Sequence, residues 1–172
     1  VDRRLRHATH VLREAGGELV ALFGPEHGFA GQAQDMIHVE GEERREGPVV
    51  HSLYGATYED LSPRPEWLDG LDAVVVDLQD VGSRYYTFVW TTALVLEVAA
   101  KVGVPVVVLD RPNPLDGVHV EGAPQRPGYR SFVGLFDVAV RHGMTIGEIA
   151  TMVRSLQGLP EESLYVVRMQ GW

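Results

Sequence analysis

The stretch that decides the fold is VVVDLQDVGSRYYTF, from Val74 to Phe88. Its valines predict a buried strand over residues 72–79, which ends in carboxylate and amide side chains. A turn glycine, Gly82, follows, and a second apolar run predicts a helix over residues 86–102. A buried strand that ends in polar residues and leads into a helix is typical of an open parallel sheet, in which ligands bind at the carboxyl ends of the strands.

The rest of the chain repeats this alternation of strands and helices. Helices are predicted at residues 5–15 and from Thr145 to about Gln157, where Thr145 and Glu148 form a capping box. A short helix is predicted within residues 63–71. Further strands are predicted at residues 18–23, 49–54, 104–109, 138–141 and 163–169. Residues 31–47 are polar and without period, which predicts a surface loop. The pattern predicts an α/β fold, with one mostly parallel sheet layered by helices in a single domain over residues 1–172.

Composition narrows the classes of partner. The chain has 172 residues, 45% of them hydrophobic, and a net charge of −9, which argues against nucleic acid and anionic membranes as partners. No apolar run reaches the length of a membrane span. Without cysteines, the chain fits either side of a membrane, so an extracytoplasmic and a cytoplasmic location both stay open.

Polar residues collect at the predicted strand ends. They are Glu26 and His27; Asp77, Gln79, Asp80 and Arg84; Asp110, Arg111 and Asn113; Glu121; and Arg141 and His142. In a doubly wound sheet these ends lie at one edge, so we expect a pocket with several carboxylates, several arginines and two histidines.

The residues of this predicted pocket bear on three kinds of chemistry. A nucleotide is disfavoured because both glycine-rich phosphate motifs are absent and Glu26 would repel a phosphate. A metal-dependent hydrolase stays open through His27, His51 and His142, but no metal-ligand spacing is present, so no metal is expected. Paired carboxylates fit hydrolysis of a glycosidic bond, with Glu26 in a partly apolar turn as the candidate general acid. The alternative is that Glu26 is an N-cap or a surface turn residue.

Seven ordered motifs carry a resemblance to a known family. They are LFGPEHGF (22–29), HSLYG (51–55), DLQDVGSRYYTF (77–88), VVLDRPNPLDG (107–117), VEG (120–122), SFVG (131–134) and RHGMTIGEIA (141–150). The chain resembles the DUF1343 family, which includes exo-acting β-N-acetylmuramidases that remove terminal N-acetylmuramic acid from peptidoglycan fragments.

The resemblance implies a Rossmann-like N-terminal domain, a smaller C-terminal domain, and a sugar site between them that needs no organic cofactor. It implies that Glu26 is the catalytic acid, next to His27, and that Glu121 is the second carboxylate. Family members begin with another strand and continue past the motif at Met169 to Trp172, so residues 1–172 are expected to be a truncated catalytic domain.

The implied substrates are muropeptides or disaccharides derived from peptidoglycan. The lactyl carboxylate of N-acetylmuramic acid suits an arginine fork, for which Arg84 or Arg141 is favoured. The alternative, favoured for Arg111, is a structural pair with a neighbouring aspartate. The predicted substrate-binding residues are Asp80, Arg84, Tyr85, Asn113, Arg141 and His142. A sugar-binding module without turnover, the stereochemical outcome and the oligomeric state are left open.

Overall fold

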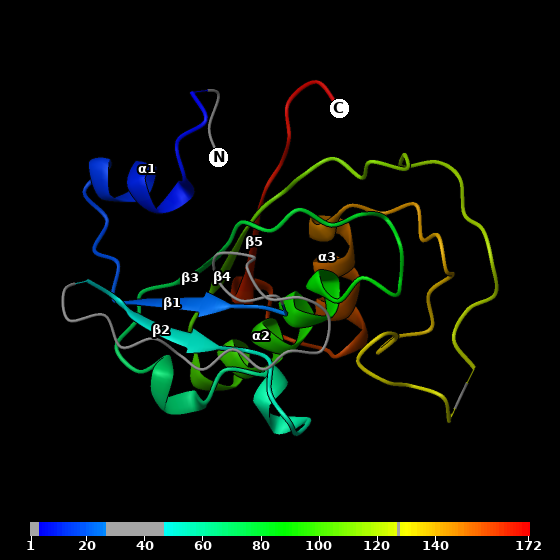
Figure 1. The fold of residues 1–172 in the computed structure, drawn as a ribbon, viewed down its shortest axis with the longest axis horizontal. Helices are drawn as coiled ribbons and strands as arrows, with labels where there is room; N and C mark the ends of the chain where they lie inside the picture. The colour runs from blue at the N-terminus through cyan, green and yellow to red at the C-terminus, as the bar shows by residue number, and fades with distance from the viewer. Residues whose placement is uncertain (1–3, 27–46, 127) are drawn as a thin grey trace. The chain divides into compact units, whose positions relative to one another are not determined.

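The computed structural model describes residues 4–26, 47–126 and 128–172 (Figure 1). The chain divides into two compact units, Val1–Leu61 and Ser62–Trp172. The predicted catalytic neighbour His27 and nearly all of the predicted loop over 31–47 lie outside the described residues. That residues 1–172 form one domain stays a prediction.

The described residues of the first unit form one helix and a pair of parallel strands. Helix α1 (Ala8–Glu14) begins after His7, whose ring accepts a hydrogen bond from the backbone N–H of Thr9. Strands β1 (Ala21–Gly24) and β2 (Val49–Ser52) pair in parallel, with Ala21 opposite Val49. A short 3-10 turn, η1 (Glu59–Leu61), ends the unit. Glu26 therefore follows β1 directly, at the carboxyl end of a parallel strand, as predicted.

The second unit is built on a three-stranded parallel sheet in the order β3-β4-β5. Its elements in chain order are η2 (Pro65–Trp67), β3 (Val74–Val76), α2 (Phe88–Val102), β4 (Val106–Leu109), α3 (Ile146–Leu156), η3 (Glu161–Ser163) and β5 (Leu164–Val167). Val75, Val107 and Tyr165 lie in register across the three strands. Strand and helix alternate along the chain, which confirms the predicted α/β class.

The core of the second unit lies between the sheet and two helices. Helices α2 and α3 pack against each other and against the central strand β4, as Figure 1 shows. The sheet residues that face this core include Val106 and Val108, both fully buried, and Trp90 of α2 is fully buried as well. Full burial of one such side chain contributes about 1.5–3 kcal/mol relative to exposure, so this layer supplies a rigid base for the loops that leave it.

Two sequence predictions are wrong in detail. Residues 138–141 form no strand, because Arg141 makes only isolated bridges to Ser83 and Glu121 while Val138 bonds back to Phe136. The apolar run over 104–109 favours a strand buried on both faces, but Val107 and Leu109 are only half-buried. The short apolar run of Val138–Val140 resembles a strand in sequence, although its hydrogen bonds go to turns and loops.

Candidate functional site

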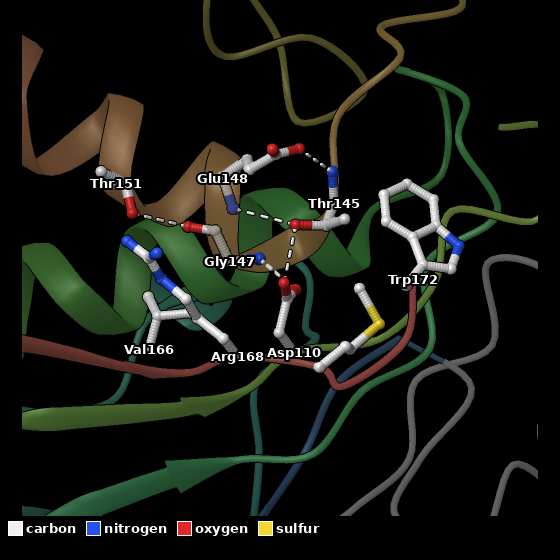
Figure 2. Close-up of a pocket in the computed structure, with 9 residues that line it drawn as sticks. Asp110, Thr145, Gly147, Glu148, Thr151, Val166, Arg168 and Trp172 are labelled. Carbon is white, nitrogen blue, oxygen red and sulfur yellow. Dashed lines mark hydrogen bonds between the residues drawn. The ribbon is translucent and has the colours of Figure 1, made fainter. Parts of the chain in front are cut away.

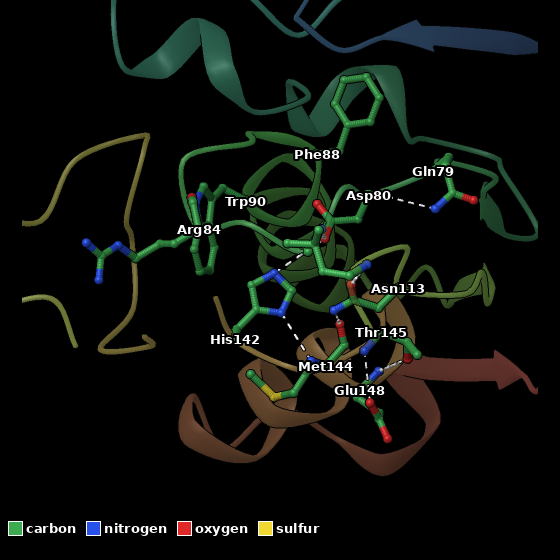
Figure 3. Close-up of polar contacts among 12 residues, drawn as sticks. Gln79, Asp80, Arg84, Phe88, Trp90, Asn113, His142, Met144, Thr145 and Glu148 are labelled. Atoms are coloured by element: carbon green, nitrogen blue, oxygen red, sulfur yellow. Dashed lines mark hydrogen bonds and ion pairs between the residues drawn. The ribbon is translucent and has the colours of Figure 1, made fainter. Parts of the chain in front are cut away.

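Three loops of the second unit are tied together by buried polar side chains (Figure 3). Asp80, after β3, accepts a hydrogen bond from the backbone N–H of Gly82 at 2.7 Å. Asn113, after β4, donates to the backbone oxygen of Met144 at 3.0 Å and accepts from the N–H of Leu115 at 2.9 Å. The loops after β3 and β4 and the loop before α3 are thereby fixed relative to one another.

His142 forms the centre of this network. Its ring is buried, and Nδ1 accepts a hydrogen bond from the backbone N–H of Met144 at 3.2 Å. Because Nδ1 is an acceptor, the ring proton is assigned to Nε2, which lies 3.3 Å from Asp80 Oδ2. The other Asp80 oxygen, Oδ1, is buried without a hydrogen-bond partner among the described residues. Asp80 and His142 thus form a buried acid–imidazole pair with a defined tautomer.

Asp110 has a structural role at the start of α3. Its Oδ1 accepts from the backbone N–H of Gly147 at 2.9 Å, and its Oδ2 accepts from the Thr145 hydroxyl at 3.0 Å. Thr145 and Glu148 complete the predicted capping box. Asp110 therefore joins the end of β4 to the first turn of α3, where a negative charge is favourable.

A pocket of about 450 Å³ lies beside this first turn of α3 (Figure 2). Arg168 and Trp172, which follow β5, form part of its wall. The two acids that line it, Asp110 and Glu148, already accept hydrogen bonds from the α3 terminus. The indole of Trp172 and the guanidinium of Arg168 therefore line the pocket. Its two carboxylates are already occupied by hydrogen bonds to the first turn of α3.

Arg111 and Arg141 are both paired with carboxylates. Arg111 Nε donates to Asp77 Oδ1 at 2.9 Å, and Nη2 contacts the same oxygen, which confirms the structural pairing favoured for Arg111. Arg141 Nη1 donates to Glu121 Oε2 at 3.0 Å, and Nη2 donates to Asp116 Oδ2 at 2.6 Å. The hydrogen bond to Glu121 raises the pKa of Arg141 above its ordinary value.

Asp116 was missed as a functional contact by the sequence reasoning. Its backbone has φ of 109°, and its Oδ1 accepts from the N–H groups of Val118 and His119, both at 2.9 Å. These backbone hydrogen bonds hold the pKa of Asp116 well below its usual range, and the bond from the His119 N–H has the largest effect. The only signal for this turn in the sequence is the Asp116-Gly117 dipeptide. Such pairs favour turns with left-handed backbone.

Arg84 differs from the other two arginines. The residue is 6% exposed, and its Nη1 donates to the backbone oxygens of Ala123 at 2.9 Å and Val138 at 2.8 Å. Its own backbone oxygen accepts from the indole N–H of Trp90 at 2.8 Å. Tyr85, 56% exposed, places its ring centroid 5.3 Å from the Arg84 Cζ. Among the described residues, no carboxylate pairs with Arg84.

The two predicted catalytic carboxylates lie in different units. Glu26 is half-buried in the turn after β1, in the first unit. Glu121 belongs to the second unit, where its backbone exchanges two hydrogen bonds with Arg141, at 3.1 and 2.9 Å, and its side chain is 69% exposed. Their predicted juxtaposition stays a prediction.

Within residues 4–26, 47–126 and 128–172, no group of three histidine or acidic side chains has the arrangement of a metal site. Across the same ranges, no helix is both long and apolar enough to cross a bilayer.

Parallel strands joined by helices, with polar side chains at the strand ends, define a Rossmann-like α/β domain. The family model described as "Exo-beta-N-acetylmuramidase NamZ, N-terminal" matches residues 1–172, and the chain belongs to this family.

Individual relatives agree with this assignment. The chain is 42% identical to the peptidoglycan beta-N-acetylmuramidase NamZ of Bacillus subtilis (strain 168), over all of this chain and 41% of that protein. Two crystal structures of DUF1343 family proteins from Bacteroides fragilis NCTC 9343 are similar. One has a TM-score of 0.86 at 40% identity, covering 100% of this chain and 43% of the other. The second has a TM-score of 0.77 at 31% identity, covering 97% and 43%. The chain thus spans about two fifths of the length of these relatives.

Proposed function

We propose that the protein is an exo-acting β-N-acetylmuramidase that releases N-acetylmuramic acid from the non-reducing ends of peptidoglycan fragments. The observation that carries this proposal is the 42% identity to a peptidoglycan β-N-acetylmuramidase over the whole of this chain. In this proposal residues 1–172 are the Rossmann-like catalytic domain, and the substrates are muropeptides or disaccharides from peptidoglycan.

The proposed chemistry uses two carboxyl groups. Glu26, at the carboxyl end of β1, donates a proton to the glycosidic oxygen as the bond to the leaving sugar breaks. Glu121 is the second carboxylate, and its ion pair with Arg141 holds it at the edge of the loop that follows β4. His27, beside Glu26, is the third proposed member of this catalytic set.

The proposed substrate-binding residues fall into two groups by the part they take. Tyr85 presents an exposed ring that suits the apolar face of a sugar, and Arg84 and Arg141 are the proposed cations, of which Arg84 has its Cζ 5.3 Å from the Tyr85 ring centroid. Asp80, Asn113 and His142 are buried, and their polar contacts connect the loops on which they lie. We therefore propose that these residues act by positioning those loops.

The test is turnover of a chromogenic N-acetyl-β-muramide by the full-length protein and its Glu26→Gln variant. Loss of a general acid lowers the rate by about 10²–10⁴-fold, so we expect a drop of that order in kcat. Glu66→Gln is the matched control, because Glu66 is exposed in the short turn η2, and its activity should equal that of the wild type.

The results also separate the alternative functions. Turnover by Glu26→Gln at the wild-type rate would remove Glu26 from the mechanism. Tight binding of the sugar by the wild type with no product after long incubation would identify a binding module instead of an enzyme.

A further inference from the structure

The guanidinium of Arg84 is a buried charge that the described chain does not neutralise. Its hydrogen bonds come from Nη1 alone and go to two neutral carbonyl oxygens, while the buried Nε has no partner among the described residues. Removing an ion from water costs several kcal/mol unless an opposite charge repays it. Among the described residues, Arg84 therefore lacks an anionic partner.

The other two candidate arginines already have their anions. Arg111 is held by Asp77, and Arg141 is held by both Glu121 and Asp116. A ligand carboxylate at Arg141 would have to displace one of two carboxylates and would meet the repulsion of the other. At Arg84 an incoming carboxylate displaces no acid of the described chain.

Arg84 lies next to an exposed aromatic side chain. Figure 3 shows the Arg84 side chain reaching away from Trp90 and from the Asp80–His142 pair, to end between stretches of irregular chain. Its Cζ lies 5.3 Å from the ring centroid of Tyr85, and more than half of the Tyr85 surface is exposed. The exposed ring of Tyr85 thus lies beside the buried guanidinium, and such a ring suits the apolar face of a sugar.

We infer that Arg84, not Arg141, receives the lactyl carboxylate of the substrate and so determines the preference for N-acetylmuramic acid over sugars without this acid. The inference rests on the proposed function and applies to N-acetylmuramic acid ends that carry no peptide, because in a muropeptide the lactyl carboxyl is bound in an amide. An arginine with an unpartnered Nε and one occupied terminal nitrogen still offers a planar edge for a carboxylate, which a lysine cannot match. Arg84 is a specificity-determining residue in this assignment.

The test compares two substrates that differ only in charge at the lactyl group: a chromogenic N-acetylmuramide, and the same compound with its carboxylate converted to a primary amide. The wild-type, full-length protein should prefer the acid in kcat/KM. Arg84→Lys should reduce this preference by about tenfold or more, the size of a lost charge-assisted hydrogen bond. Arg130→Lys is the matched control, since Arg130 pairs with Asp137 at an exposed site, and it should keep the wild-type preference.

The inference would be overturned if Arg141→Lys lost the preference for the acid over the amide while Arg84→Lys kept it. A direct measurement covers the case in which Arg84→Lys does not fold. The side-chain Nε–Hε signal of Arg84, assigned through bonds in the wild-type protein by NMR, should shift on addition of N-acetylmuramic acid and not of its amide. An unchanged signal at saturating sugar would also overturn the inference. Absence of all hydrolysis would refute the proposed function instead, and the NMR result would still decide the role of Arg84.

Discussion

At the scale of single residues, Gly82 shows how tightly the loops of the second unit approach one another. Its φ is +83°, and a Cβ at this position would lie 2.2 Å from Asn113 Oδ1. Gly82→Ala therefore combines a strained backbone with a steric clash, and we expect a loss of about 2–4 kcal/mol in the free energy of unfolding, measured by urea denaturation. Gly70→Ala is the control, because Gly70 has φ of +74° but nothing within 4 Å of a Cβ, so only the backbone cost applies. Equal losses in both variants would show that the Asn113 contact relaxes without cost.

Asp116 makes stability depend on pH. The backbone N–H of His119, then that of Val118, lowers the pKa of Asp116 in the folded protein from its ordinary value of 3.8. A carboxyl group with a lowered folded pKa stabilises the fold above its unfolded pKa and loses that contribution as the pH falls through the folded value. We therefore expect Asp116→Asn to be less stable than the wild type at pH 7, with the difference shrinking below about pH 4. Unfolding free energies measured across this range check the prediction, and a difference independent of pH would contradict it.

At the scale of elements, the sequence predicted what local chemistry decides. The capping box of Thr145 and Glu148 fixes the start of α3 in sequence and in structure, and the apolar run before Gly103 marks α2 and its end. Strand β4 follows from its valines. These features need only neighbouring residues, which is why a single sequence reveals them.

Long-range contacts could not be predicted in this way. Arg84 and Arg141 have the same side chain and are both favoured by the sequence as partners of the lactyl carboxylate, yet one is bound by carbonyl oxygens and the other by two carboxylates. The partners of Arg84, Ala123 and Val138, contribute backbone oxygens whose positions depend on the path of an irregular segment. The sequence therefore predicted the residue types of the candidate site, but not which arginine has no carboxylate partner among the described residues.

At the scale of the whole molecule, the protection of backbone amides should follow the layers of the fold. Strand β4 bonds to both β3 and β5, and its Val106 and Val108 are fully buried, so its amides open only when the second unit unfolds. Helix α1 has seven residues and none of them is buried, so its amides open locally at little cost.

Hydrogen exchange followed by mass spectrometry or NMR measures this contrast directly. We expect the β4 amides to be among the slowest in the chain and the α1 amides to exchange orders of magnitude faster, because α1 buries none of its seven residues among the described part of the chain and short helices depend on tertiary packing. The amides of α2, which packs on β4 and α3, should resemble those of β4 and serve as the internal control for helical hydrogen bonds. Protection of α1 equal to that of α2 would mean that a further layer covers α1, and the exposed surface of that helix would then have to be reassigned as an interface.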